Sequence, residues 1–149
     1  MTGRVTARRL TALIAGVAGV VAIALPASAG ASFDRHFSVL AHGTGGHETS
    51  YGFAFGFDLL NPANPSNQVG HGHARCRVPA HKARCKIVFH FDGTIGGFGD
   101  LLVKGNFGDG DQTFAVADGN GDFSGRIAGK AVTHTLNRNT DLVHFDLTR

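Results

Sequence analysis

The sequence predicts an all-β fold, and within that class a small closed antiparallel barrel of about eight strands. Three observations predict it. Apolar and polar residues alternate with a period of two in several segments after residue 30, and no segment there keeps a helical period. Short clusters of Gly, Asn, Asp and Pro separate these segments. Glycine also recurs inside the predicted strands, which favours a coiled, closed barrel over a flat sandwich.

The first 29 residues predict a signal peptide helix that precedes the barrel. An uncharged apolar run, residues 10–25, is short for a membrane span and follows a segment with three arginines. Pro26 and the small-residue pattern Ala27-Ser28-Ala29 come next. We therefore expect cleavage after Ala29, with an uncleaved anchor as the alternative. The predicted organisation is a signal peptide at 1–29 and a single β-barrel domain at 30–149, secreted and without a stable membrane span after cleavage.

Charge after the leader is balanced. Three of the 14 Lys and Arg residues lie in the leader, which leaves 11 of them against 11 Asp and Glu. The pI of about 9.2 therefore belongs to the whole chain and not to the barrel. Without a global basic field, we expect no nucleic-acid partner and no general attraction to an anionic membrane.

The strands are expected in the following order, with turns between them. The predicted strand segments are 33–39, 51–59, 69–77, 84–92, 94–107, 113–117, 123–135 and 141–147. Gly-rich or Pro-containing connections are predicted at 42–47, 61–67 and 108–111. The Asn-Gly pair within 118–122 predicts a tight hairpin turn.

Segment 51–59 has the strongest alternation in the chain. Its odd positions are large and apolar, whereas its even positions are Gly, Ala or Asp. If the small face lines the lumen, Asp58 becomes a candidate catalytic acid or base among apolar groups. If the aromatic face lines the lumen, Asp58 points outward and is inert. The candidate ligand-binding residues are the phenylalanines of this strand and of the 84–92 strand: Phe53, Phe55, Phe57, Phe89 and Phe91.

The 69–77 and 84–92 segments are predicted to form a hairpin. A disulfide between Cys76 and Cys85 is favoured in an exported chain and would fix the register. That register gives one apolar and one polar face, as burial on one side requires. The hairpin also carries five cations: Arg75, Arg77, Lys82, Arg84 and Lys86. They predict either a local contact with an anion, a polysaccharide or a phospholipid or, as the preferred interpretation, like charges that keep an exposed hairpin from pairing with other chains.

Three histidines fall on the polar face in this register: His71, His73 and His90. Imidazoles so placed can bind Zn, Cu or Ni. The cations Arg75 and Lys86 share the face and oppose a bound metal. We therefore predict a solvated polar face, keep the three histidines as a secondary metal hypothesis, and expect no cofactor.

The C-terminal half resembles the bacterial secreted members of the allene-oxide-cyclase-like and dirigent-like barrel family. The resemblance rests on the Gly-rich strand 91–97, on the Phe-Ala-Val segment 114–125 and on Ala128-Gly129. Upstream, Asp58-Leu59 and Val69-Gly70 sit where plant dirigent proteins have similar pairs. The resemblance implies an eight-stranded barrel with a ligand cavity. It also implies a homo-oligomer, namely a trimer. In plant relatives that cavity cyclises an unsaturated epoxide or steers phenoxy-radical coupling, and a dirigent-like aspartate would fall on Asp58.

Three functions follow in order of preference. The first is a secreted barrel that binds or orients a small apolar molecule. The second is an isomerase or cyclase acting on an apolar substrate in the lumen. The third is a structural or protein-interaction barrel without a ligand.

Overall fold

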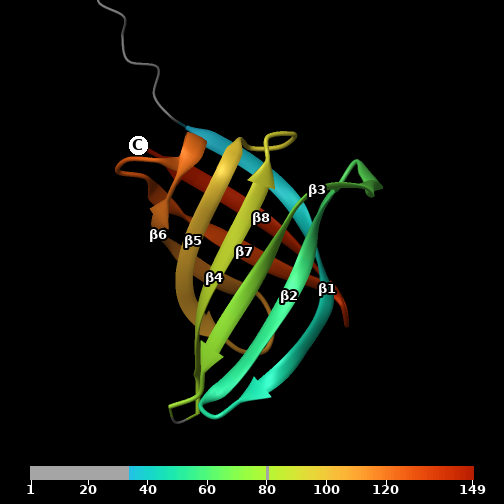
Figure 1. Ribbon diagram of the computed structural model, residues 1–149, viewed down its shortest axis with the longest axis vertical. Coiled ribbons are helices and arrows are strands. Elements are labelled where there is room, and N and C mark those ends of the chain that lie inside the picture. Colours follow the sequence, from blue (N-terminus) through green and yellow to red (C-terminus); the bar gives the residue numbers. More distant parts are fainter. Residues whose placement is uncertain (1–33, 80) are drawn as a thin grey trace, which may run out of the picture. The chain divides into compact units, whose positions relative to one another are not determined.

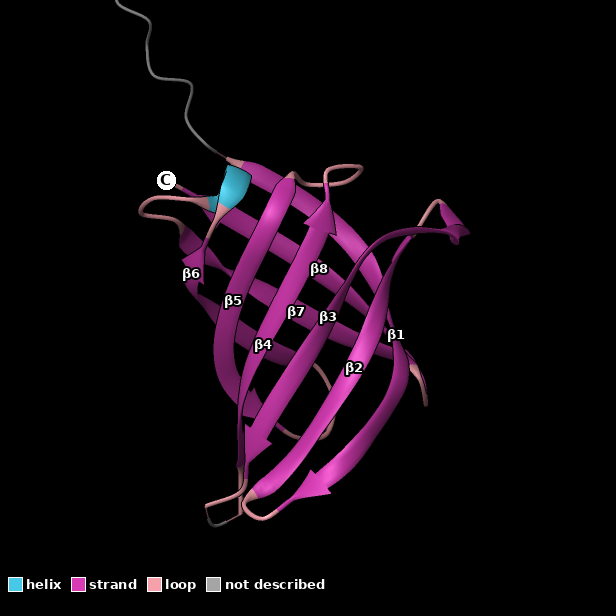
Figure 2. Cartoon of the chain, viewed as in Figure 1, coloured by secondary structure: helices cyan, strands magenta, loops and turns pink. Residues whose placement is uncertain are grey.

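The computed structural model describes residues 34–79 and 81–149, and the predicted signal peptide lies outside these ranges. The described chain is all-β, with one 3-10 turn, η1 (Gly121–Phe123), as Figure 2 shows. The strands are β1 (Arg35–Thr49), β2 (Gly52–Asn61), β3 (Asn64–Arg77), β4 (Ala83–Asp92), β5 (Phe98–Phe107), β6 (Gln112–Gly119), β7 (Ala128–Asn137) and β8 (Thr140–Thr148). The predicted fold class is confirmed.

The eight strands form one closed antiparallel barrel in chain order (Figure 1). Each strand pairs with its neighbours in sequence, and β1 pairs with β8 from Arg35–Leu147 to His42–Thr140 to close the ring. This closure gives every strand a hydrogen-bonded neighbour on both sides over part of its length, whereas the part of β1 after His42 pairs with β2 alone. Among the described residues, no helix has the length and apolar character needed to cross a membrane.

Alternation along the strands builds the core. In β2 the odd-numbered side chains point inward, so Phe57 and Leu59 are buried. The same period holds in β4, where Ile87, Phe89 and Phe91 are buried. Among the described residues, no polar or charged residue is buried. The aromatic face of the 51–59 segment is therefore the lumen face.

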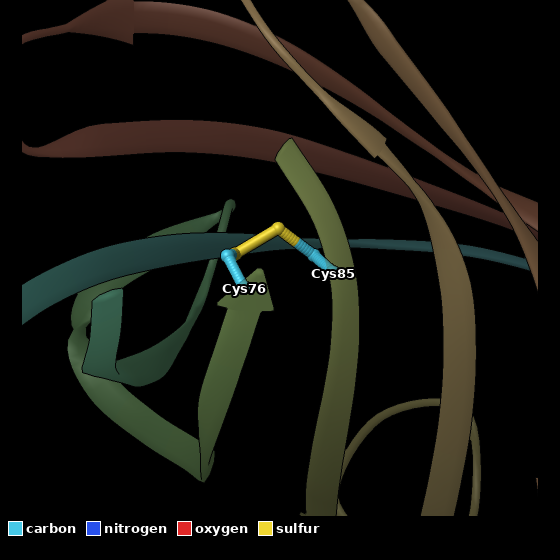
Figure 3. The surroundings of a disulfide bond; sticks show 2 residues. All are labelled: Cys76 and Cys85. Atoms are coloured by element: carbon cyan, nitrogen blue, oxygen red, sulfur yellow. A yellow bond between two sulfur atoms is a disulfide. The ribbon is translucent and has the colours of Figure 1, made fainter. Parts of the chain in front are cut away.

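The predicted hairpin register is confirmed for the eight pairs from Gly70–Phe91 to Arg77–Arg84. Cys76 on β3 lies opposite Cys85 on β4, and the two form the predicted disulfide (Figure 3). Both cysteines are buried on the lumen side. The disulfide joins the two strands near the end of the hairpin.

Several predicted connections and strand boundaries differ from the structure. Residues 42–47 belong to β1, with a bulge between Gly43 and Gly45, because β2 supplies hydrogen-bond partners there. β3 already begins at Asn64, so the predicted 61–67 loop reduces to a turn. β5 begins only at Phe98, after bends at 93–96. The Asn-Gly pair does not make a hairpin turn, because η1 and a longer connection lie between β6 and β7.

The two ends of the barrel differ. One end is filled by stacked and edge-on phenylalanines: Phe91 contacts the rings of Phe37, Phe123 and Phe145 at centroid distances of 5.3–5.5 Å. The opposite end carries the β1–β2, β3–β4, β5–β6 and β7–β8 turns, and we call it the cavity end. In Figure 1 the β1–β2 and β3–β4 turns lie together at the bottom of the view.

Candidate functional site

A cavity of about 540 Å³ enters the barrel from the cavity end. Its walls are the inward faces of β1, β2, β4, β5, β6, β7 and β8, and the β7–β8 turn also lines it. Six phenylalanines line it: Phe53, Phe55, Phe57, Phe89, Phe107 and Phe114. A hollow of this size with aromatic walls matches the usual dimensions of a small-molecule site.

The aromatic wall is continuous. Phe55 lies 6.2 Å from Phe53 and 6.0 Å from Phe107, measured between ring centroids. Phe57 lies 5.4 Å from Phe89, with a tilted arrangement of the two rings. Faces and edges of several rings are thus presented to the same space. Such a wall offers ring faces for offset stacking and ring edges for T-shaped contacts.

Polar groups line the cavity where β7, β8 and the turn between them adjoin β1, and we call this set of residues the polar rim. They are Thr44, Thr133, Arg138, Asn139, Thr140 and Asp141. The backbone N–H of Gly43 donates to the carbonyl of Asn139 over 2.7 Å, which ties the β7–β8 turn to the bulge in β1. The turn is further ordered by the Asn139 N–H, which donates to the Asn137 side chain. A bound apolar molecule would therefore meet one guanidinium and one carboxylate where it enters.

The structure brings four of the five predicted ligand-binding residues to this cavity. Phe53, Phe55, Phe57 and Phe89 line it, whereas Phe91 lies in the packed opposite end. Sequence reasoning missed two of the wall phenylalanines, Phe107 and Phe114, and the whole polar rim. The alternation of β5 and β6 contained a signal for the two phenylalanines, but nothing local marked Arg138 or Asp141.

Asp58 lies on the outer face of the barrel. Its cross-strand partners are His42 on β1 and His71 on β3. The side-chain amide of Gln68 donates to Asp58 Oδ1 over 3.1 Å. Asp58 is therefore separated from the cavity by the strand itself, as expected when the aromatic face lines the lumen.

The predicted histidine cluster also lies on the outer face. The rings of His71 and His90 stack with centroids 4.7 Å apart, and His73 lies 5.7 Å from His90. Nδ1 of His90 is 2.5 Å from Asp100 Oδ1, so a carboxylate on β5 already engages this ring. In the described ranges, no group of three or more His, Cys, Asp or Glu residues is arranged to hold a metal ion.

Two groups of this outer cluster have shifted pKa values. Partial removal from water, followed by the charges of His90, Arg75 and His71, lowers the pKa of His73 below 6.5. Burial alone would raise the pKa of Asp100, but hydrogen bonds from Asn120 and His90 outweigh it and lower the pKa below 3.8. The cluster thus favours a neutral His73 beside an ionised Asp100.

Comparisons with known proteins agree on the fold alone. No protein-family model matches the sequence, and no curated protein does. A solved structure of pyocyanin demethylase matches with a TM-score of 0.63 and 14% identity, over 76% of this chain and 100% of that chain. The structure of a pterocarpan synthase dirigent protein matches with a TM-score of 0.57 and 14% identity, over 78% of this chain and 84% of that one. The described chain therefore has the closed eight-stranded barrel fold of the allene-oxide-cyclase-like and dirigent-like proteins, as the sequence resemblance predicted.

Proposed function

We propose that this protein is a secreted barrel that binds and orients a small, planar, apolar molecule in the cavity. The observation that supports the proposal is the 540 Å³ hollow with six phenylalanines on its walls and polar groups only at its rim. A fold that needed only a packed core would gain from filling this space, because an apolar void loses dispersion contacts. The names of both structural neighbours refer to small molecules, which agrees with this use of the barrel.

The rim determines which molecules fit. Arg138 and Asp141 line the cavity together with three threonines. A ligand with an apolar ring system and one polar substituent would bury the rings and leave the substituent at the rim. Secretion is part of the proposal, and it is supported by the leader sequence and by the disulfide.

The proposal is tested with an uncharged aromatic probe, N-phenyl-1-naphthylamine, whose fluorescence rises in apolar surroundings. We expect saturable binding, weakened about three- to tenfold by Phe55→Ala, because each lost aromatic contact contributes about 0.5–1.5 kcal/mol. Ala41→Phe, which adds a ring at the cavity wall, should block the probe. Mass spectrometry of extracts of the purified protein then identifies the molecule that the cavity carries.

The matched control is Phe98→Ala. Phe98 is 63% exposed and does not line the cavity, so its loss should leave probe affinity unchanged. Equal weakening by Phe55→Ala and Phe98→Ala would contradict binding in the cavity. Absence of any saturable binding would leave the structural or protein-interaction barrel as the better assignment.

An isomerase or cyclase is the second candidate, and Asp141 is the observation that favours it. Among the described residues that line the cavity, Asp141 is the only carboxylate, and Arg138 stands in the same rim. An acid or base there could act on a bound substrate, whereas Asp58 cannot reach one from the outer face. If Asp141→Asn keeps ligand affinity but stops conversion of the co-purified molecule, the catalytic function replaces simple binding. If neither the wild-type protein nor Asp141→Asn converts the molecule, binding without catalysis remains the proposed function.

A further inference from the structure

The outer face of β3, β4 and β5 carries a dense group of cations, which we call the basic face. Its members are Arg75, Arg77, Arg84, Lys86 and Lys104, all exposed. They surround a surface hollow of about 820 Å³ whose lining contains no carboxylate. Among the described residues, no Asp or Glu forms an ion pair with any of these five side chains.

The cations face one another directly across the sheet. Arg75 pairs with Lys86, and Lys86 pairs with Lys104, which makes a row across three strands. Arg77 and Arg84 form a second pair. Neighbouring strands lie about 4.8 Å apart, and like charges directly opposite each other destabilise a sheet. Folding alone therefore gives no reason for this arrangement.

Protection of a strand edge does not explain the basic face either. Like charges commonly keep exposed edge strands from pairing with other chains. Here each of the five cationic residues has a cross-strand partner on both sides within the closed barrel, so none of them stands on an edge. The interpretation preferred from sequence, protection of an exposed hairpin, thus loses its physical basis. An anionic partner becomes the better explanation.

An apolar tip adjoins the basic face at the cavity end. The tip consists of Tyr51, Val78 and Pro79, and Tyr51 is 77% exposed while Val78 is 46% exposed. The backbone N–H of Val78 donates to the carbonyl of Tyr51 over 3.0 Å, so the two turns are held together. The three residues of the tip line a second surface hollow, and Arg77 lines both this hollow and the hollow of the basic face. The tip and the basic face therefore form one continuous surface.

We propose that the basic face and the tip dock this protein on the surface of an anionic phospholipid bilayer. The cations of the basic face would contact lipid phosphates and carboxylates. The tip, including the ring of Tyr51, would enter the headgroup region. A nucleic acid or an acidic polysaccharide offers the charge but no apolar phase for Val78 and Pro79. Docking brings the cavity end toward the bilayer, yet it does not depend on whether the cavity is occupied.

The test is sedimentation with vesicles of phosphatidylcholine alone or with about 30% phosphatidylserine, at low and high salt. We expect binding only to the phosphatidylserine vesicles, and a loss at high salt. Lys86→Gln/Lys104→Gln should weaken that binding roughly fivefold for each charge removed. Tyr51→Ser/Val78→Ser should also weaken it, and should make the remaining binding more sensitive to salt.

The matched control is Arg126→Gln/Lys130→Gln, which removes the same charge from exposed positions outside the basic face. All variants carry the same N-terminal segment, so differences between them report on the barrel. Circular dichroism verifies that each variant keeps its strand content. Equal binding to both vesicle types, or an equal loss in the control, overturns the proposal. An unchanged affinity in Tyr51→Ser/Val78→Ser also overturns it, in favour of a soluble polyanion.

Discussion

Single residues set the shape of the cavity wall, and Gly72 shows this best. It lies between Phe57 on β2 and Phe89 on β4 in the strand register. A Cβ atom at Gly72 would overlap the ring of Phe57 and lie 2.6 Å from the carbonyl oxygen of Val88. The absence of a side chain therefore lets the Phe57 ring lie flat over β3 instead of filling the cavity.

We predict that Gly72→Ala both destabilises the barrel and weakens probe binding. The added methyl group must displace Phe57 toward the cavity or move the backbone, and such overpacking costs about 1–3 kcal/mol. Urea unfolding measures the first effect, and N-phenyl-1-naphthylamine titration measures the second. Gly108→Ala is the control, since nothing lies within 4 Å of that site. A Gly72→Ala protein as stable as wild type would contradict this packing.

The β3–β4 hairpin combines a stabilising covalent link with destabilising charge rows. Cys76 and Cys85 are nine residues apart and bridge the strands on the lumen side. The cation pairs of the basic face lie on the opposite side of the same strands. The disulfide is therefore placed where repulsion between the strands is greatest.

We predict that Cys76→Ala/Cys85→Ala lowers the free energy of unfolding by about 2–3 kcal/mol, the value expected for closing a loop of this length. The barrel should still form, because the remaining pairs of the hairpin and the phenylalanine core are unchanged. Urea unfolding at low and high salt checks the prediction. High salt should restore part of the lost stability by screening the cation rows. If the variant loses no stability, the disulfide has no structural role in the hairpin.

The elements that the sequence predicts well are those with strong local patterns. The β3–β4 register follows from the cysteine pair together with alternation, and both signals lie within the hairpin. Residues 42–47 were predicted as a turn because glycines dominate there, but their strand partners come from β2. The cavity walls follow from alternation in β2 and β4. The rim does not, because Arg138 and Asp141 reach the cavity only through the pairing of β8 with β1.

For the whole barrel, closure has two consequences. It gives every strand a neighbour on both sides in the ring, and it makes the two ends different, one packed with phenylalanines and one hollow. Function is therefore expected at one end. The proposed ligand cavity and the apolar tip belong to that end, and so does Arg77, the member of the basic face that adjoins the tip.

Positive and negative charges are unevenly distributed over the barrel, although its net charge is balanced. Six of the 11 basic residues after the leader are Lys82 and the five members of the basic face. The other five stand among 11 acidic residues, so the remainder of the barrel has an acidic surplus. A protein with such separated charges orients in an electric field and meets a charged surface with one face.

We therefore predict that two variants of identical net charge behave differently on a cation exchanger at pH 7. Lys86→Gln/Lys104→Gln removes charge from the face that would contact the resin, whereas Arg126→Gln/Lys130→Gln removes it elsewhere. The first variant should elute at distinctly lower salt than the second, and the second should elute close to wild type. Because the net charge of the two variants is the same, the location of the removed charges separates them. Elution of both variants at one salt concentration would show that the basic face does not act as a unit.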